Sequence, residues 1–351
     1  GHQPLYNEDN TLALVFNGEI YNYREIRQDL VAKGHIFKTH SDSEVLVHGF
    51  EEYGEGLVPK LRGMFSFIIF NTVTHELFGA RDPFGIKPLY YAQFGETFMF
   101  GSEIKGFVPH PDFTAILNEK ALSNYLSFQY SPTEETFFKG VYKLPPAHYF
   151  TYKDGKMEKT RYFRPEFLAD TKNKTMDEYA RIVDDAIKES VEAHKISDVE
   201  VGSFLSSGID SSYIAATANV DKTFTVGFGK DEKYNEISFA KEFADFINTE
   251  NIAKVITPEE YWGEFPNIQY HMDEPLADPA AVPLYLRNAP TQLMADLGYA
   301  DGYKYAHDYP EHYVKQQYLP DEIKDAKFYE PTEMGFEKQI RERLERLNGE
   351  S

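Results

Sequence analysis

The chain contains no cysteine among its 351 residues. Disulfide bridges, thiolate metal ligands and a cysteine nucleophile are therefore excluded within it. Positive charge is also scarce: 36 lysines and arginines face 57 aspartates and glutamates, which gives a net charge of −21. A chain this acidic lacks the basic surface that nucleic-acid binding requires. We therefore expect small-molecule partners and no nucleic acid.

Long apolar runs are missing as well. No run approaches the roughly 20 residues of a transmembrane helix, and no signal peptide is visible. We therefore expect no membrane partner and a cytoplasmic location. The chain starts GHQPLYNEDN, without an initiator methionine, which favours a processed or truncated product. A homo-oligomer is compatible with the sequence, which does not predict one.

The first part of the chain alternates strand pairs and helices. Residues 11–22 predict a strand that runs into a turn at Asn17-Gly18. Residues 23–34 and 41–54 predict helices, the second with an Asp/Ser cap, and residues 64–82 and 89–103 predict two hairpins. This order is typical of an α+β layered domain. Residues 172–195 predict an amphipathic helix, and its inner face consists of Ile182, Val183, Ala186, Ile187, Ser190 and Val191.

From residue 199 the pattern changes to β-α-β-α-β. The strands are VEVGSFLSSG, KTFTVGFG and ENIAKVITPEEY, with SSYIAATANV and EISFAKEFADFIN as the helices between them. Such alternation predicts an open parallel sheet with helices on both faces. The last 65 residues show no strand alternation and predict a helical, irregular tail.

The stretch FLSSGIDSS (204–212) follows the first of these strands. Ligands of parallel sheets bind at the carboxyl ends of strands. Gly208 can adopt a positive φ, and the next helix presents free N–H groups to an anion. Asp210 suits such a site only if Mg²⁺ lies between it and phosphate oxygens. The alternative is an ordinary helix cap by serine or aspartate.

This loop resembles the pyrophosphate loop of N-type ATP pyrophosphatases, and its surroundings resemble glutamine-dependent asparagine synthetase. The usual loop of that family is SGG-[LI]-DSS, so Ser207 replaces its first glycine. The segment MDEPLADPAAVPLYL (272–286) is also similar to the family, or is merely a proline-rich loop. The resemblance implies that Leu205 and Val226 frame the adenine and that Asp210 holds Mg²⁺ through the phosphates. It implies an ATP site formed by Leu205, Ser206, Ser207, Gly208, Asp210, Ser211, Ser212 and Val226.

The segments FNGEIYNYREIR (16–27) and SDSE (41–44) resemble the glutamine site of the same family. The resemblance implies an oxyanion hole made by the Asn17 side chain and the Gly18 N–H. It further implies that Glu19 helps to bind glutamine and that Asp42 holds the substrate ammonium. Taken alone, Asn17-Gly18 is better explained by a hairpin turn.

Three further segments match the family in order and spacing. They are RGMFSFIIF (62–70), ARDPFGIKPLYY (80–91) and FGSEIKG (100–106). We predict that Arg81, Asp82 and Lys87 have mainly structural roles.

The resemblance implies three parts. Residues 1–150 form an N-terminal-nucleophile glutaminase domain without its start, and residues 151–286 form a partial ATP pyrophosphatase domain of the adenine-nucleotide α-hydrolase type. The tail, residues 287–351, comes third. The implied activity is that of an ATP-dependent carbon–nitrogen ligase. It amidates aspartate to asparagine through an acyl-adenylate, with ammonia from glutamine, so glutamine, aspartate, ATP and Mg²⁺ are the expected substrates and cofactors.

Two departures limit this expectation. The family's nucleophilic cysteine and its SGEG-type loop are absent from the sequence, and covalent catalysis requires the nucleophile. From about residue 284 the tail resembles the C-terminal end of the AAA+ ATPase of the replication-associated recombination protein A type, without its Walker motifs. We therefore expect a chimera joined near residues 283–288, by gene fusion or assembly error, that is truncated at both ends and catalytically impaired. The alternatives are a noncatalytic ATP- and glutamine-binding or assembly module, or a replication-associated factor.

Overall fold

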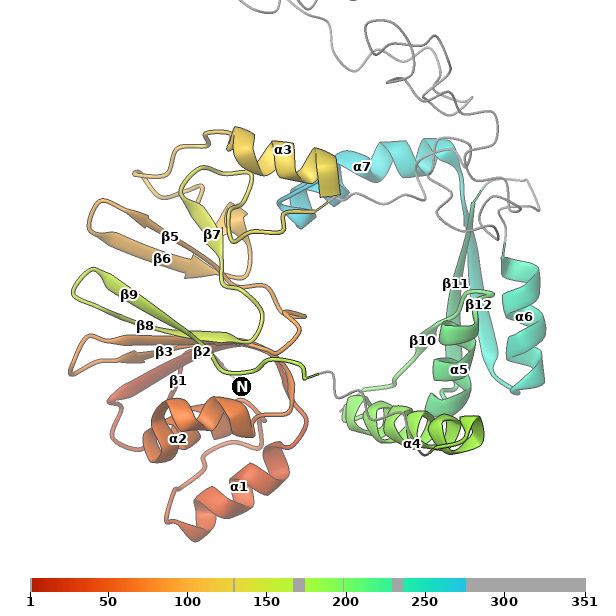
Figure 1. Cartoon of the computed structure of the whole chain (residues 1–351), viewed down its shortest axis with the longest axis horizontal. Helices are drawn as coiled ribbons and strands as arrows, with labels where there is room; N and C mark the ends of the chain where they lie inside the picture. Colours follow the sequence, from red (N-terminus) through yellow and green to blue (C-terminus); the bar gives the residue numbers. More distant parts are fainter. Residues whose placement is uncertain (1, 129, 167–173, 198, 229–235, 276–351) are drawn as a thin grey trace, which may run out of the picture. The chain divides into compact units, whose positions relative to one another are not determined.

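The computed structural model describes residues 2–128, 130–166, 174–197, 199–228 and 236–275 (Figure 1). The predicted tail and the predicted junction near 283–288 lie outside these residues, as does the segment 272–286 beyond Pro275. The strands are β1 (Leu5–Tyr6), β2 (Leu12–Ile20), β3 (Gly63–Asn71), β4 (Leu77–Arg81), β5 (Tyr90–Phe94), β6 (Thr97–Gly101), β7 (Val141–Lys143), β8 (His148–Lys153), β9 (Lys156–Arg161), β10 (Ser203–Phe204), β11 (Lys222–Phe228) and β12 (Glu250–Ile256). The helices are α1 (Tyr23–Ala32), α2 (Glu44–Tyr53), α3 (Glu119–Phe128), α4 (Met176–His194), α5 (Ile209–Ala218), α6 (Ile237–Phe246) and α7 (Pro258–Met272), with short 3₁₀ turns η1 (Gly54–Lys60) and η2 (Ile104–Gly106).

The first region, from β1 to β9 (residues 5–161), is layered. Its main sheet has the order β1-β2-β3-β4-β8-β9 with antiparallel pairs, and a second sheet has the order β6-β5-β7. Helices α1 and α2 cover one face of the main sheet, and the second sheet lies over the other (Figure 1). The predicted helices and hairpins of this region are confirmed within a few residues.

Strand β3 shows why the sequence produces these layers. Side chains of a strand alternate between its two faces. Phe65, Phe67 and Ile69 pack in the core below α1 and α2, whereas Ile68 packs in the core between the two sheets. A strand buried on both faces requires residues that are mostly apolar on both sides, as in FSFII. Its one polar member, Ser66, donates to the Pro88 carbonyl (2.9 Å).

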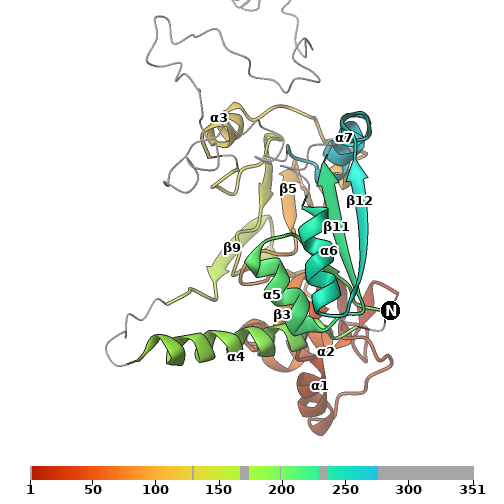
Figure 2. The ribbon, with the colours of Figure 1, turned by 90° about the vertical axis from the view of Figure 1, so that its right-hand side faces the viewer.

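The second region, from α4 to α7 (residues 176–272), contains the parallel sheet β10-β11-β12. Helix α5 connects the first pair and α6 the second. Because both crossovers are expected to be right-handed, both helices lie on the same face of the sheet (Figure 2). Their contact is made mainly by small residues, namely Ala215, Ala240 and Ala244 against Leu205. The predicted fold class, a layered α+β domain followed by a parallel α/β sheet, is therefore confirmed.

The opposite face of this sheet is open. Phe224, Val226 and Phe228 of β11 are 38%, 44% and 47% exposed, while Thr223 and Thr225 between them are buried. The prediction of helices on both faces is therefore wrong for the described residues. The β-α-β-α-β pattern shows that crossovers exist, but both crossovers in this sheet run over one side.

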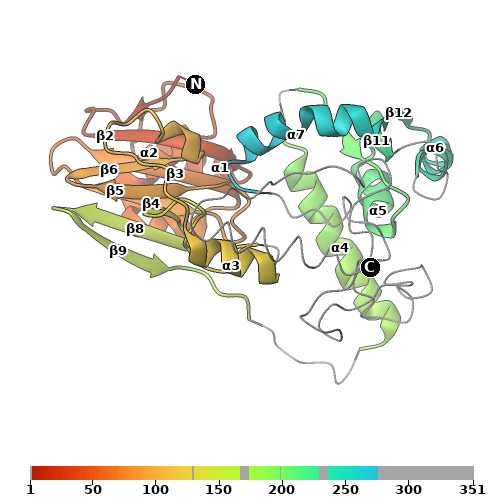
Figure 3. The same ribbon diagram turned by 90° about the horizontal axis from the view of Figure 1, so that it is seen from above.

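The predicted inner face of the helix at 172–195 is only partly correct. Helix α4 starts with a capping box between Thr175 and Glu178, and it lies beside α5 (Figure 3). Val191 is buried and packs with Ile187 against α5. Ile182 and Val183 are 50% and 55% exposed and Ala186 is exposed as well, so their predicted burial is wrong. The apolar stripe of α4 is longer than the surface that covers it.

None of the helices in the described ranges combines the length and apolar character that crossing a membrane requires.

Buried tyrosines of the first region should limit stability at alkaline pH. Tyr90 is 9% exposed, and burial raises its pKa from 10.0 to about 12. The folded state therefore favours the neutral phenol, and its contribution is complete below pH 10 and lost as the pH rises through 12. We expect the free energy of unfolding to fall by about 2 to 3 kcal/mol from this group over that range. Urea titrations of wild type and Tyr90→Phe between pH 9 and about 12 check this, and an identical pH dependence would contradict it.

Candidate functional site

The residues predicted to bind the substrate glutamine lie at or beside the carboxyl end of β2. The predicted turn at Asn17-Gly18 is wrong, because β2 continues to Ile20 and pairs with β3 throughout. The N–H of Tyr21, just after β2, donates to the carbonyl of Arg62, just before β3 (2.7 Å). Successive N–H groups of a strand point to opposite sides, so the N–H of Gly18 points away from β3, to the open edge of β2.

The open edge of β2 carries two acceptors beside this glycine. The Phe16 N–H donates to Gln3 Oε1 (2.7 Å) and the Ile20 N–H donates to Asp42 Oδ2 (2.8 Å). The Gly18 N–H lies between them and has no acceptor among the residues that the structure describes. The Gly18 N–H is thus a free backbone donor two residues before Ile20, whose N–H binds the Asp42 carboxylate.

A close approach of two strands requires the glycine at position 18. Its φ is +152°, and a Cβ there would lie 2.1 Å from the Met64 carbonyl oxygen. The same applies across the pair, where a Cβ at Gly63 would lie 2.1 Å from the Glu19 carbonyl oxygen. Both obstacles are backbone atoms, which cannot rotate away. Gly18 and Gly63 therefore set the separation of β2 and β3 at the candidate site.

The two side chains next to Gly18 have partners. Asn17 Nδ2 donates to Ser102 Oγ (3.0 Å), which follows β6. This bond links the main sheet to the second sheet. Glu19 also interacts with other described residues, and its charge contributes, after burial, to raising the pKa of Tyr21.

Arg81 and Asp82 are structural, as the sequence analysis predicts. Asp82 is fully buried; its Oδ1 accepts from the N–H groups of Phe84 and Ile86, and its Oδ2 from those of Phe65 and Lys87, at 2.9 to 3.3 Å. The Arg81 guanidinium donates to the carbonyls of Lys87, Leu144 and Gly85, and burial lowers its pKa. The pair fixes the turn from β4 to β5.

The second candidate site is the loop between β10 and α5. Gly208 is the N-cap of α5 with φ −76°, so the positive φ considered for it does not occur. Ser211 Oγ lies 2.7 Å from Ser206 Oγ and also accepts from the Ser206 N–H (3.1 Å). Neither Ser207 nor Asp210 uses its side chain in a hydrogen bond or ion pair with another described residue, and both are exposed. The side-chain cap of the alternative interpretation is not formed.

A buried polar ladder holds the base of this loop. The Leu205 carbonyl accepts from Thr225 Oγ1 (2.8 Å), and Asn251 Nδ2 donates to the hydroxyls of Thr223 and Thr225 (3.0 and 2.9 Å). Buried hydroxyl and amide groups need such partners. The ladder joins the end of β10 to Thr223 and Thr225 of β11 and to Asn251 of β12. The buried Asn251 Oδ1 has no hydrogen-bond partner among the described residues.

The two residues expected to frame adenine lie on opposite faces. Leu205 is 2% exposed and packs against α5 and α6, whereas Val226 belongs to the open face. The structure therefore does not bring their side chains together.

Sequence reasoning missed Glu236. Its Oε2 accepts a hydrogen bond from the Ser207 N–H (3.3 Å), so a carboxylate already occupies one donor of the loop. Nothing in the sequence around Glu236 points to this contact, because the residue lies 29 positions away.

Comparison with known proteins identifies the family of each of the two regions. Residues 1–163 match the model of the glutamine amidotransferase domain, and residues 182–289 match that of asparagine synthase. Asparagine synthetase [glutamine-hydrolyzing] 1 of Bacillus subtilis is 47% identical over 290 residues, which is 81% of this chain. Up to residue 289, the chain belongs to the family of glutamine-hydrolysing asparagine synthetases.

Other relatives extend this comparison. A putative asparagine synthetase [glutamine-hydrolyzing] of Mycobacterium bovis is 40% identical over 303 residues and 81% of this chain. The chain spans 45% and 46% of the lengths of these two asparagine synthetases. Residues 273–348 match the model of the MgsA AAA+ ATPase C terminus, which agrees with the resemblance of the tail. A glutamine phosphoribosylpyrophosphate amidotransferase structure from B. subtilis covers 72% of this chain and 48% of its own at 20% identity, with a TM-score of 0.33, too low for a functional comparison.

The close approach at position 18 predicts a large effect of a single methyl group. Gly18→Ala should lower the free energy of unfolding by about 3 kcal/mol, because β2 and β3 must move apart. Gly56→Ala is the matched control, since a Cβ there meets nothing within 4 Å, and should change stability by less than about 0.5 kcal/mol. Urea denaturation measures both, and equal stability of the two variants would contradict the argument.

Proposed function

We propose that this chain carries the glutamine-binding and ATP-binding regions of a glutamine-hydrolysing asparagine synthetase. The reaction is the ATP-dependent amidation of aspartate, through an acyl-adenylate, with ammonia released from glutamine. One observation carries the proposal: the open edge of β2 holds a free Gly18 N–H next to Asp42. The family to which the chain belongs supports it, and a cytoplasmic location forms part of the proposal.

The proposed organisation has a glutaminase domain over residues 1–150, an ATP pyrophosphatase domain over 151–286 and a tail over 287–351. Strand pairing in the main sheet continues to Arg161 on β9, which supports moving the proposed boundary between the first two domains from residue 150 to a position after Arg161.

In the proposed glutamine site, the Gly18 N–H and the Asn17 side chain stabilise the negative charge that develops on the glutamine amide oxygen when a nucleophile adds to the amide carbon. Donors fixed in advance are effective because they need not reorganise when charge develops. Strand pairing fixes the Gly18 N–H, and the Ser102 hydroxyl fixes the Asn17 amide. Asp42 supplies the negative charge for the substrate ammonium, and Glu19 lies on the same strand segment.

Asp42→Asn tests the ammonium role. Loss of the carboxylate charge should weaken glutamine binding at least about tenfold, since a charge-assisted hydrogen bond contributes roughly 1.5 to 3 kcal/mol. Asp154→Asn is the matched control, because Asp154 lies in the turn between β8 and β9 with φ 49°, where asparagine is well tolerated. Calorimetric titration with glutamine measures both, and unchanged affinity in Asp42→Asn would refute this assignment.

In the proposed ATP site, the backbone of Ser206, Ser207 and Gly208 and the hydroxyls of Ser211 and Ser212 surround the phosphates at the amino end of α5. The helix dipole favours an anion there. Asp210 fits Mg²⁺ because its carboxylate is exposed and uncommitted among the described residues. Val226 offers an apolar surface for adenine, and Leu205 contributes by fixing the base of the loop. When a phosphate binds there, the Glu236 carboxylate must leave the Ser207 N–H. The Ser206 and Gly208 N–H groups must likewise leave Ser211 Oγ and Ser206 Oγ.

Asp210→Ala distinguishes a metal-dependent phosphate site from an ordinary helix start. With Mg²⁺ present, the variant should bind ATP at least about tenfold more weakly; with the metal chelated, it should bind ATP as well as wild type or better, because a like charge has been removed. Asp221→Ala is the matched control, since Asp221 immediately precedes β11 at the opposite end of the sheet.

Titration calorimetry with and without Mg²⁺ measures these affinities. Equal Mg·ATP affinity in wild type and Asp210→Ala would refute the Mg²⁺ role of Asp210 and would make the loop an ordinary connection between β10 and α5.

A second candidate function is a noncatalytic module that binds glutamine and ATP. The observation that favours it is that these 351 residues contain no cysteine, so they cannot themselves supply a thiolate nucleophile. We expect no glutamate release from glutamine by this chain, and no more than a trace of asparagine from aspartate, ATP and ammonia. Clear glutamate release would overturn the noncatalytic interpretation, whereas failure to bind either substrate would overturn both functions.

A further inference from the structure

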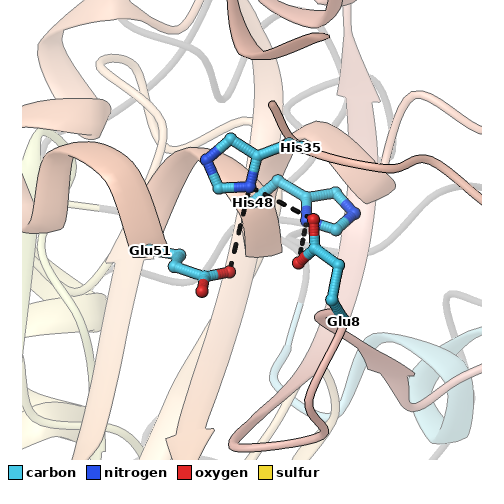
Figure 4. Close-up of side chains that lie close together, drawn as sticks. All are labelled: Glu8, His35, His48 and Glu51. Atoms are coloured by element: carbon cyan, nitrogen blue, oxygen red, sulfur yellow. Dashed lines mark ion pairs between the residues drawn. The ribbon is translucent and has the colours of Figure 1, made fainter. Parts of the chain in front are cut away.

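Four side chains of the first region converge at a place that the proposed glutamine site does not use (Figure 4). Glu8 lies between β1 and β2, His35 follows α1, and His48 and Glu51 lie on α2. One nitrogen or oxygen atom of each lies within 4.8 Å of the corresponding atoms of the other three.

The inner atoms of this cluster are not satisfied by hydrogen bonds. The His48 side chain is 1% exposed, and its Nδ1 lies 3.1 Å from Glu8 Oε2. Both atoms are buried, yet neither forms a hydrogen bond of acceptable geometry. A buried polar atom without such a partner costs roughly 1 to 3 kcal/mol. A cation bound by both atoms would remove that cost.

The far sides of the two imidazoles face carboxylates. His48 Nε2 lies 3.5 Å from Glu44 Oε1, and that carboxylate already accepts from the N–H groups of Lys38 and Thr39. Nε2 is therefore the donor, which leaves Nδ1 to face the cluster. His35 is arranged in the same way, with Nε2 3.6 Å from Glu52 Oε2 and Nδ1 3.3 Å from Glu8 Oε1.

The two carboxylates of the cluster are also held from outside. Glu8 Oε1 accepts from the Ile36 N–H (2.9 Å), and Glu51 Oε2 accepts from Asn7 Nδ2 (3.2 Å). Asn7 is fully buried, and its side-chain oxygen Oδ1 accepts from the Leu12 N–H. Protein metal ligands are usually oriented by such outer partners.

The donor set and spacing favour zinc. Two imidazole nitrogens with two carboxylate oxygens suit Zn²⁺ and related first-row ions, whereas Mg²⁺ and Ca²⁺ prefer oxygen alone. Ligand bonds of about 2.0 to 2.2 Å in a tetrahedron place donor atoms roughly 3.4 Å apart. The separations are 3.1 Å from His48 Nδ1 to Glu8 Oε2, 3.3 Å from His35 Nδ1 to Glu8 Oε1, and 4.0 Å from His35 Nδ1 to Glu51 Oε2. Each histidine thus faces a different oxygen of Glu8. Two carboxylates would also neutralise a divalent charge.

We propose that Glu8, His35, His48 and Glu51 form a binding site for a zinc-type divalent cation. The site joins the loop before β2, the end of α1 and the helix α2, three segments that otherwise meet through the core below the main sheet. Metal binding therefore stabilises this layer, because the ligands are separated in the unfolded chain.

Calorimetric titration of the chelator-treated full chain with Zn²⁺, without nucleotide, tests the site. Wild type should bind one Zn²⁺ per chain, and its Tm should rise with Zn²⁺. His35→Gln and Glu51→Gln change partly exposed side chains, so they should fold, and each should bind Zn²⁺ at least tenfold more weakly. His40→Gln is the matched control, because His40 is exposed and outside the cluster, and it should behave as wild type.

Co²⁺ provides an independent readout. Replacement of Zn²⁺ by Co²⁺ in wild type should give the intense visible absorption of a tetrahedral site, and the band should be absent from His35→Gln and Glu51→Gln. The proposal is overturned if wild type binds no Zn²⁺ stoichiometrically, which would make the cluster a set of charge-assisted contacts. Equal binding by wild type and both cluster variants would also overturn it, because the metal would then lie elsewhere.

Discussion

The pairing of β2 with β3 is the constraint on which the first region depends. Gly18 and Gly63 let the two backbones approach so closely that a methyl group on either would strike a carbonyl oxygen at 2.1 Å. This approach fixes the register of β2, and the register determines which of its N–H groups face the open edge. Near the same end of β2, the Ile20 N–H donates to Asp42 and the Asn17 side chain donates to Ser102, which follows β6 of the second sheet. The site and the packing of the layers therefore rest on one pair of strands.

The second region is organised differently. Its loop between β10 and α5 is held by hydrogen bonds among Ser206, Gly208 and Ser211. The base of the loop is held by the Thr225 and Asn251 ladder. Small residues let α5 and α6 pack closely on the covered face, while the open face leaves Val226 accessible. The first region thus holds its site by backbone pairing, and the second by buried side-chain hydrogen bonds.

Sequence reasoning located most of this architecture. Strong periodicity identified the helices and hairpins, and the β-α-β-α-β order identified the parallel sheet. The turn at Asn17-Gly18 was wrong because an Asn-Gly pair is a local signal, and long-range pairing with β3 overrides it. The burial of Ile182 and Val183 was wrong because a helix pattern does not show how far a covering surface extends. The contact of Glu236 with the loop and the cluster around His48 join residues that are distant in sequence, so no spacing rule could reveal them.

Asp82 illustrates how charge near a candidate site can mislead. Each of its oxygens accepts two backbone N–H groups, so its acceptor sites are occupied by the fold itself. A screen that scores only turnover would nevertheless count its substitutions among the most damaging, and would group Asp82 with residues that touch ligand. Measurements of folded fraction alongside activity separate the two kinds of loss, and the saturated carboxylate shows in advance to which kind Asp82 belongs.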